Sequence, residues 1–308
     1  MSHNHSHTSH NHQHPKLSGK NLLISIFLNI VITTAQIIGG FLSGSLALIS
    51  DAIHNLSDVI SLIVSYIANR LSNSKKQTLK QTFGFKRAEI IAAFFNAATL
   101  IIIAFFLAIE AIKRFNNLQE IQSDLVIWLA LLGILANGFS VLLLKKDAEH
   151  NLNMKSAYLH LLTDMLTSVA VLIGGLIMKY YHIYWIDALL TLIISLYLVY
   201  MSWKIFLESL KILMLFAPDN IDIADIEKSI LKIESIKNIH HVHIWQLNDT
   251  NSHFEAHIEF KKDIKLSEFD FICEQIEHIL AHDFNINHSN LQPEFHRDDN
   301  KIFIIQDE

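Results

Sequence analysis

The stretch Ser45-Leu-Ala-Leu-Ile-Ser-Asp-Ala-Ile-His-Asn-Leu-Ser-Asp-Val-Ile-Ser-Leu62 decides how this chain folds, because it places ionisable groups inside an apolar segment. It is typical of a membrane-spanning helix, yet it contains Asp51, His54 and Asp58. His54 and Asp58 are four residues apart, so on a helix they share one face, with their Cβ atoms about 6 Å apart. An ionisable group inside a bilayer costs about 2.5–3.5 kcal/mol even on the lenient insertion scales, and such groups usually mark a functional site.

The same spacing recurs about a hundred residues later, as His160-Leu-Leu-Thr-Asp164 in another apolar segment. Two such pairs supply two imidazoles and two carboxylates, a four-ligand set that suits Zn²⁺. Co²⁺ and Cd²⁺ also accept these ligands, whereas Mg²⁺ and Ca²⁺ prefer shells made only of oxygen. The alternative is that each polar side chain only bonds to a neighbouring helix. The repeated pair favours a metal site.

The composition indicates several membrane spans joined to a soluble part. Of the 308 residues, 51% are hydrophobic and 18% are charged, which is too apolar for an ordinary soluble domain. The net charge of −6 is uneven, because residues 1–218 carry +5 and residues 219–308 carry −11. A basic membrane half followed by an acidic end is more typical of a protein that handles cations than of one that binds nucleic acid. The single cysteine, Cys273, excludes an intramolecular disulfide framework and a thiolate-rich zinc site within one chain.

The N-terminal segment, residues 1–20, is polar and is expected to be disordered. It interleaves Ser, Asn and Thr with six histidines: His3, His5, His7, His10, His12 and His14. Loose metal capture is the functional interpretation, and a passive polar segment is the alternative. No cleavable signal peptide is recognised.

Six apolar segments follow, each long enough to cross about 30 Å of hydrocarbon as a helix. They lie at about 21–43, 46–70, 87–112, 124–144, 155–178 and 184–206. Lysine and arginine gather before the first segment and in the second and fourth loops, while the other loops hold few. The positive-inside rule therefore places both termini in the cytoplasm.

After Pro218 the pattern predicts a small α+β domain, residues 215–308, with the order α-β-β-α-β. We expect a helix from an Asp222 N-cap to about Ser235 and strands at 239–247 and 252–260. A helix from Ser267 to about His282 and a strand at 286–294 follow. Strand 252–260 alternates apolar residues, expected in the core, with a polar face of His253, Glu255, His257 and Glu259, expected in solvent.

Four ordered motifs resemble those of the cation diffusion facilitator family, over about residues 20–295. The stretch from Gly44 to Asp58 is similar to the family's second helix, and Gly84-Phe-Lys-Arg-Ala-Glu89 to the start of its third. His150-Asn-Leu-Asn-Met-Lys-Ser-Ala-Tyr-Leu-His-Leu-Leu-Thr-Asp164 resembles the fifth helix. His240-His-Val-His-Ile-Trp245 resembles the first strand of the family's cytoplasmic domain, which is ferredoxin-like.

This resemblance implies that His54, Asp58, His160 and Asp164 bind the transported metal. Family members with histidine in both pairs prefer zinc, whereas Asp in place of the first histidine goes with other or broader metals. The family implies a homodimer in the bilayer that exchanges Zn²⁺ for protons.

In the C-terminal domain the resemblance implies a second, cytoplasmic metal site made of His240, His257 and Glu294. The chain departs from the family pattern at His241, which replaces an Asp, and at Gln292, which replaces a ligand histidine of some members. Asp270 occupies the position of another histidine, and His241 with His243 offers replacement ligands on one strand face. The loop from Leu71 to Phe85 contains no His, Asp or Glu, so no extra loop site is expected.

Two further acidic residues in the apolar segments have open roles. Asp51 is either an outer staging ligand or a partner in interhelical hydrogen bonds. Asp187, near the outer end of the sixth segment, either caps a helix or faces an interface.

We therefore expect a six-helix inner-membrane protein with a cytoplasmic α+β domain, which exports Zn²⁺ by proton antiport and binds zinc as a regulatory ligand. A broader Zn²⁺/Co²⁺/Cd²⁺ exporter is the alternative within transport. A membrane metal sensor without flux is another class. An intramembrane zinc hydrolase is disfavoured, because no His-Glu-x-x-His motif occurs.

Overall fold

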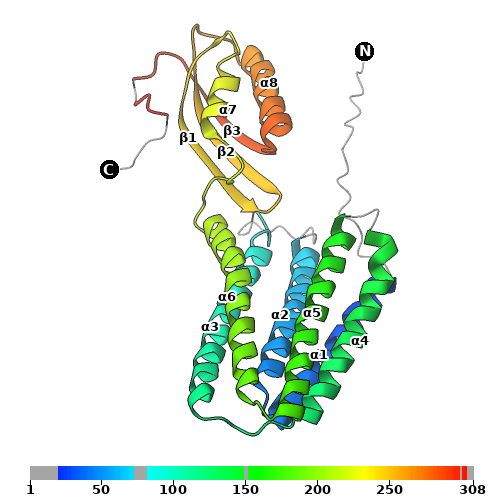
Figure 1. The fold of residues 1–308 in the computed structure, drawn as a ribbon. Coiled ribbons are helices and arrows are strands. Elements are labelled where there is room, and N and C mark those ends of the chain that lie inside the picture. Colours follow the sequence, from blue (N-terminus) through cyan, green and yellow to red (C-terminus); the bar gives the residue numbers. More distant parts are fainter. Residues whose placement is uncertain (1–19, 73–81, 149–151, 299, 304–308) are drawn as a thin grey trace. The chain divides into compact units, whose positions relative to one another are not determined.

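A computed structural model describes residues 20–72, 82–148, 152–298 and 300–303 (Figure 1). The chain divides into two compact units, one of residues 1–60 and 102–199 and the other of residues 61–101 and 200–308. The N-terminal histidine-rich segment lies outside the described residues, except for Lys20.

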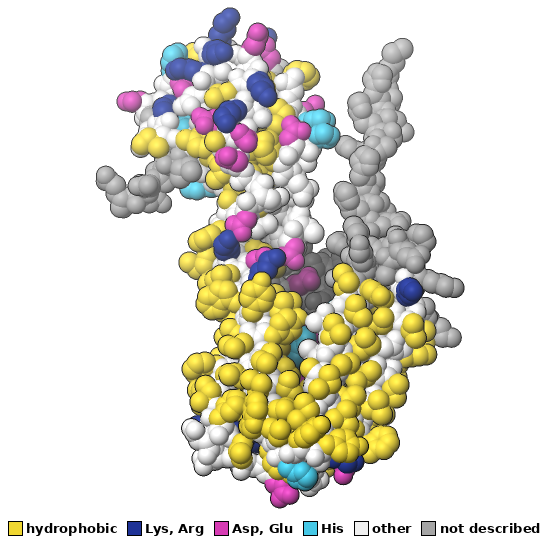
Figure 2. Space-filling view, viewed as in Figure 1, with side chains coloured by type: hydrophobic (Ala, Val, Ile, Leu, Met, Phe, Trp, Pro, Cys, Tyr) yellow, Lys and Arg dark blue, Asp and Glu magenta, His cyan; other side chains and the backbone are white. Residues whose placement is uncertain are grey.

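Six long helices occupy the six apolar segments, as predicted. They are α1 (Lys20–Ser43), α2 (Leu46–Ser72), α3 (Ala88–Asn116), α4 (Ser123–Ala148), α5 (Leu152–Tyr181) and α6 (Trp185–Leu213). Hydrophobic side chains cover most of the visible face of this helical part (Figure 2). Such a surface suits lipid rather than water.

By length and composition, α1 and α3 to α6 contain stretches that are able to cross a membrane. In α2, four polar residues interrupt an otherwise apolar run: Asp51, His54, Asn55 and Asp58. Its exposed apolar residues, Leu56, Ile60, Ile63 and Ile67, still recur every three or four positions along one helix face.

The first unit is held by close contacts between helices. α4 packs against α1 and α5, and its Leu129 shares a buried cluster with Leu48 of α2 and Leu198 of α6. A Cβ atom on Gly39 of α1 would lie only 1.8 Å from Leu129 Cδ1. The absent side chain of Gly39 is therefore what lets α1 approach α4 so closely.

The C-terminal domain has the predicted order α-β-β-α-β. Its elements are α7 (Ile223–Ile230), β1 (Ile236–Asn248), β2 (Asn251–Phe260), α8 (Leu266–Phe284) and β3 (His288–Glu294). The sheet order is β1-β2-β3, with β1 antiparallel and β3 parallel to the central strand β2. Ile226 and Ile230 of α7 and Ile276 and Leu280 of α8 share one core with β2, so both helices cover the same face of the sheet (Figure 1).

Two local predictions for this domain are wrong. The first helix has the expected Asp222 N-cap but ends at Ile230, because the chain turns before β1 begins at Ile236. The polar face of β2 is not uniformly exposed, since His253 is 6% exposed and Glu259 is 4% exposed. β2 is the central strand, so neighbours on both sides cover these residues. Glu259 pairs with Lys237 on β1.

Candidate metal centre

The structure brings together the two His–Asp pairs that the sequence singles out. α2 supplies His54 and Asp58, and α5 supplies His160 and Asp164, all within the first unit. His54 Nε2 lies 3.5 Å from Asp164 Oδ1, and His160 Nε2 lies 3.2 Å from Asp58 Oδ2. His160 Nε2 is also 3.6 Å from Asp164 Oδ2. His54, Asp58 and Asp164 offer ligand atoms that all lie within 4.8 Å of one another, and His160 joins this group through its contacts with the two aspartates.

The spacing of these atoms suits a small divalent cation. Zn²⁺ binds N and O ligands at about 2.0–2.2 Å, which sets the ligand-to-ligand distance in a tetrahedron at about 3.4 Å. The cross-helix contacts of 3.2 and 3.5 Å are close to this value. His54 approaches Asp58 through Nδ1 at 3.7 Å and Asp164 through Nε2, so a single ion would take one of its two ring nitrogens.

The carboxylate of Asp164 is poorly satisfied for a buried group. Its side chain is completely buried, and within the described part of the chain neither of its oxygens has a hydrogen-bond partner. The Asp58 Oδ2 atom is also buried and makes no hydrogen bond of good geometry, although His160 Nε2 lies 3.2 Å away. A buried carboxylate without hydrogen bonds is costly unless a cation neutralises it. The donor set is therefore matched to a positively charged ligand.

The cluster is more open on one side than on the other. The side chains of His160 and Asp58 are 43% and 25% exposed, whereas those of His54 and Asp164 are 12% and 0% exposed. Along their helices, Asp58 and His160 are the members of each pair nearer to residues 73–87 and 149–151. Those loops adjoin the lysine-rich and arginine-rich sequence. Asp58 and His160 are therefore the more accessible members of the cluster.

Asp51 lies one helical turn from His54 and belongs to a different network. Its carboxylate accepts hydrogen bonds from Gln36 Nε2 at 3.0 Å, Thr167 Oγ1 at 2.9 Å and Ser168 Oγ at 3.2 Å. Asn55 of α2 donates in turn to Gln36 Oε1. These contacts link α1, α2 and α5 and agree with the interhelical role rather than the staging role.

Asp187 of α6 acts as a cap on another helix. Its carboxylate accepts from the backbone N–H of Leu46 at 2.8 Å and of Ala47 at 3.3 Å, and from the hydroxyl of Ser45. The first N–H groups of a helix have no partner within the helix, and an acidic group there also meets the positive end of the helix dipole. Asp187 therefore fixes the beginning of the helix that carries His54 and Asp58.

One aromatic neighbour of the cluster was not anticipated from the sequence. The ring of Tyr197 on α6 meets the His54 ring edge-on, with centroids 6.3 Å apart. Tyr197 lies in a helix that is apolar around its whole circumference, so its spacing gave no signal.

A second cluster lies in the C-terminal domain and joins the three predicted residues His240, His257 and Glu294. Glu294 at the end of β3 lies with Oε2 3.2 Å from His240 Nε2 and with Oε1 2.9 Å from His257 Nδ1. Strand pairing produces this arrangement, because His240 pairs with His257 across β1 and β2. One ligand atom from each residue lies within 4.8 Å of the others.

The residues that depart from the family pattern have different positions around this cluster. His241 sits at a bulge in β1 with φ +52°, and its ring stacks on His257 with centroids 4.6 Å apart. His243 lies 5.1 Å from His241 by the same measure. Gln292 donates to Glu294 Oε1 at 3.0 Å. Asp270 is not a member of the cluster among the described residues.

Cys273 on α8 is unsuited to metal binding. Burial, together with the Glu277 and Asp270 carboxylates, raises the pKa of its thiol to about 11. The thiolate is the metal ligand and nucleophile, so a neutral thiol here has a packing role.

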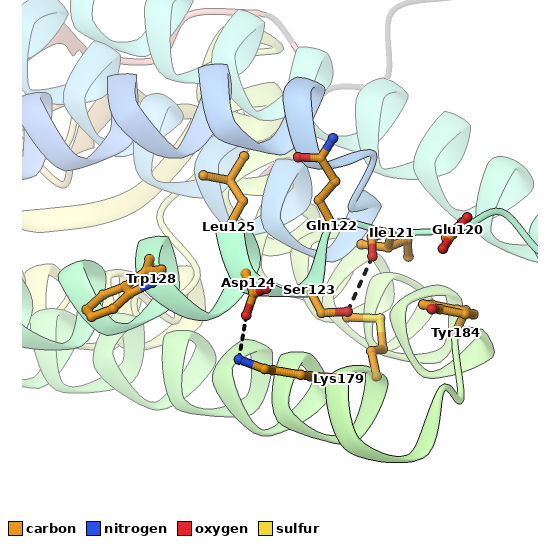
Figure 3. A pocket seen from close by; sticks show the side chains of 10 residues that line it. Glu120, Ile121, Gln122, Ser123, Asp124, Leu125, Trp128, Lys179 and Tyr184 are labelled. Atoms are coloured by element: carbon orange, nitrogen blue, oxygen red, sulfur yellow. Dashed lines mark hydrogen bonds and ion pairs between the residues drawn. The ribbon is translucent and has the colours of Figure 1, made fainter.

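A surface hollow of about 750 Å³ lies within the first unit (Figure 3). Lys179 Nζ and Asp124 Oδ1 pair across it at 2.6 Å. Lys179 lies nineteen residues beyond His160 on α5, about 28 Å along the helix axis. The hollow is therefore separate from the His–Asp cluster.

Comparison with known proteins identifies both parts of the chain. Residues 22–214 match the cation efflux transmembrane domain, and residues 218–296 match the cytoplasmic domain of cation efflux proteins. A Bacillus subtilis protein named cadmium, cobalt and zinc/H(+)-K(+) antiporter is 36% identical over 98% of this chain and 95% of its own length. Zinc transporter ZitB of Escherichia coli is 33% identical over 96% of this chain and 93% of its own length.

A third relative, metal cation efflux system protein CzcD of Cupriavidus metallidurans, is 32% identical over 92% of this chain and 89% of its own length. The two domain matches together cover most of the chain, in the order that the helices and the α+β domain follow. The chain therefore belongs to the cation diffusion facilitator family and is a multi-pass membrane protein for divalent cation efflux.

Proposed function

We propose that this protein exports Zn²⁺ from the cytoplasm in exchange for protons, through a site made of His54, Asp58, His160 and Asp164. One observation carries the proposal. Ligand atoms of His54, Asp58 and Asp164 lie within 4.8 Å of one another, and the cross-helix contacts His54–Asp164 and His160–Asp58 are close to the spacing of tetrahedral zinc ligands. Membership of a family of efflux transporters makes the protein a carrier rather than an enzyme, so the intramembrane hydrolase alternative is set aside.

Proton exchange follows from the chemistry of the ligands. Zn²⁺ binds neutral histidine and ionised aspartate, so loading of the metal expels protons held at these groups. Histidine titrates near neutral pH, so protons from the outer side compete with zinc for His54 and His160. The name of the Bacillus subtilis relative supports a proton-coupled mechanism and adds K⁺ as an ion to test.

The broader Zn²⁺/Co²⁺/Cd²⁺ exporter remains the second candidate, and the name of the same relative favours it. Histidine at position 54 supports zinc, because the family members that have histidine in both pairs prefer zinc. Transport with several metals in competition separates the two candidates.

The exposure of the site supports loading from the cytoplasm. His160 and Asp58 are its accessible members, on the side of the basic loops. The positive-inside rule places those loops, and both termini, in the cytoplasm of a cell with the protein in its inner membrane.

We assign the His240–His257–Glu294 cluster as a cytoplasmic zinc site that regulates transport. Its three ligand-type side chains converge from three strands, and the charge of the domain is strongly acidic. The match to the family's cytoplasmic domain supports a homodimer. Zinc at this site would favour one arrangement of the two subunits.

The deciding experiment is metal uptake into inside-out vesicles with an imposed pH gradient. We expect zinc flux in the wild type and none with His54→Ala or Asp164→Ala, although both variants insert and fold. Asp124→Ala and His278→Ala, which remove the same groups from exposed positions outside the cluster, serve as matched controls. Wild-type flux in the cluster variants would sink the site assignment.

The same vesicles test the coupling and the alternatives. Flux that ignores both the pH gradient and a K⁺ gradient contradicts antiport. Metal binding without any flux in the wild type would instead favour a membrane sensor.

A further inference from the structure

The chain continues past β3 as a C-terminal strap, defined here as residues 295–298 and 300–303, that returns to β1. The backbone N–H of His241 donates to the carbonyl of Ile302 at 3.2 Å, and that of Val242 donates to Phe303 at 2.8 Å. β1 is an edge strand of the sheet, and these bonds lie at its bulge. Phe303 also packs against the core of the domain. The strap is therefore docked against the strand that carries His240.

This docking places two cations of the strap at the acidic residue of the cytoplasmic cluster. Lys301 Nζ lies 2.9 Å from Glu294 Oε2 and 3.4 Å from His240 Nε2. Arg297 Nη1 lies 3.3 Å from Glu294 Oε1. The Glu294 side chain is only 1% exposed and that of Lys301 is 28% exposed, so the Lys301 contact is shielded from water.

We propose that Lys301 is a built-in competitor of the metal at this site, so that zinc binding displaces Lys301 and loosens the strap. The inference rests on the proposed cytoplasmic zinc site. A Zn²⁺ ion held between His240 Nε2 and Glu294 Oε2, which lie 3.2 Å apart, would bind the two atoms that Lys301 contacts, at about 2.0–2.2 Å. An ammonium group already 2.9 Å and 3.4 Å from these two atoms cannot stay there beside a divalent cation.

The competition has consequences in both directions. A charge-assisted contact to a buried carboxylate is one of the stronger hydrogen bonds in a protein, so Lys301 weakens zinc binding about tenfold or more. Reciprocity of linked equilibria requires that zinc weaken strap docking by the same factor. The strap thereby sets the zinc level at which the site fills, and its release exposes the edge of β1 at His241 and Val242.

Zinc affinity of the full-length protein in detergent tests the inference. The background chain carries Asn at the six N-terminal histidines and Ala at His54 and His160, which leaves the cytoplasmic site for titration against a chromophoric zinc chelator. In this background we expect Lys301→Met, which keeps the aliphatic stem, to bind zinc about tenfold more tightly. Lys301→Arg keeps the charge and should stay close to the parent. Lys262→Met removes an exposed lysine of the same domain and should change nothing.

Hydrogen exchange supplies a second readout that reports the strap itself. Zinc should speed exchange at the His241 and Val242 amides about tenfold in the parent chain, because their acceptors lie on the strap. In the Lys301→Met variant these amides should exchange faster before zinc is added. Amides of β2 that pair with β3 serve as internal controls.

His240→Ala distinguishes the failure of the inference from the failure of the site. If His240→Ala abolishes zinc binding while Lys301→Met leaves zinc affinity and hydrogen exchange unchanged, the zinc site is supported. The proposal that Lys301 competes with zinc is then wrong. If neither substitution alters zinc binding, the assignment of a cytoplasmic zinc site is wrong, and so is the proposal that Lys301 competes with zinc there. If Lys301→Met binds zinc more tightly and the further substitution His240→Ala removes this binding, both the zinc site and the competition by Lys301 are supported.

Discussion

His160 of α5 lies 3.2 Å from Asp58 of α2, closer than the 3.6 Å that separates it from Asp164 on its own helix. The same holds for His54, which is 3.5 Å from Asp164 and 3.7 Å from Asp58. Each histidine therefore lies nearer to the aspartate of the opposite helix than to the aspartate of its own pair. A shift of α2 along α5 would separate these cross-helix contacts first. Such a shift would weaken metal binding, as a transporter that opens to each side of the membrane in turn requires.

The first prediction concerns metal selectivity. Exchanging His54→Asp replaces a neutral imidazole by a third, shorter carboxylate, which leaves more room for the larger Cd²⁺ ion. We expect the ratio of zinc to cadmium transport to fall roughly tenfold, a difference of about 1.4 kcal/mol. Competition between the two metals in proteoliposomes measures it. An unchanged ratio would show that position 54 does not determine selectivity.

The second prediction concerns the Asp51 network. Asp51→Leu leaves donors on Gln36, Thr167 and Ser168 without their acceptor, at about 1–3 kcal/mol for each group that stays buried. We expect a lower melting temperature in detergent and weaker metal binding, because α2 loses its link to α5. Asp51→Asn keeps a similar shape and polar contacts, so it should stay near the wild type. Equal loss in both variants would instead indicate that the charge of Asp51 is needed.

The meeting of the two His–Asp pairs on α2 and α5 was largely predictable because its signal is local. A spacing of four residues puts His54 and Asp58 on one helix face whatever surrounds them, and polar groups stand out in an apolar segment. The choice of cross-helix partners was not predictable, since it depends on how α2 and α5 pack. The partner of Asp187 was also not predictable. The sequence suggests that Asp187 caps a helix, but the helix that it caps is α2, which begins 141 residues earlier in the chain.

The C-terminal domain shows where local pattern fails. Alternation along β2 correctly identified Phe254, Ala256 and Ile258 as core, but it could not tell a central strand from an edge strand. His253 and Glu259 are buried by the neighbouring strands rather than by their own alternation. The contacts of Lys301 likewise depend on the return of the chain to β1, for which no periodic signal exists.

The third prediction tests Asp187 as the cap of α2. Asp187→Ala removes the acceptor of two backbone N–H groups and one hydroxyl, and loss of a helix cap costs about 1–2 kcal/mol. We expect a lower melting temperature and reduced zinc affinity, because α2 carries half of the cluster. Asp124→Ala is the control, since its exposed pair with Lys179 contributes little. A similar change in both variants would argue against a specific cap.

The fourth prediction uses a double-mutant cycle at the α1–α4 contact. Gly39→Ala forces a methyl group to within 1.8 Å of the present position of Leu129 Cδ1, and overpacking of this kind costs about 1–3 kcal/mol. The cost should largely vanish in a Leu129→Ala background. Gly138→Ala meets only Met165 Sδ at 3.5 Å, an ordinary contact, so it should be neutral or stabilising. Additive effects of Gly39→Ala and Leu129→Ala would contradict the close approach.

The last prediction concerns acid sensitivity of the C-terminal domain. Burial lowers the pKa of His253, and the neighbouring His288 and Lys86 lower it further. The unfolded histidine titrates near about 6.5, so as the pH falls the unfolded state takes up its proton first. Stability linked to His253 is therefore fully present above about pH 6.5 and is lost progressively as the pH falls from that value through the lower pKa of the folded state.

Hydrogen-exchange protection of β2 amides in the purified protein, corrected for intrinsic exchange, measures this loss between about pH 7.5 and pH 5.5. His253→Gln cannot be protonated, so it should flatten the dependence, whereas the exposed His278→Ala on α8 should leave it as in the wild type. An equally steep dependence in His253→Gln would assign the acid sensitivity to other groups. The ring of His253 stacks on Trp245 with centroids 5.4 Å apart and meets His288 at 4.5 Å. Burial of this ring, with His288 and Lys86 nearby, favours its neutral form in the folded domain.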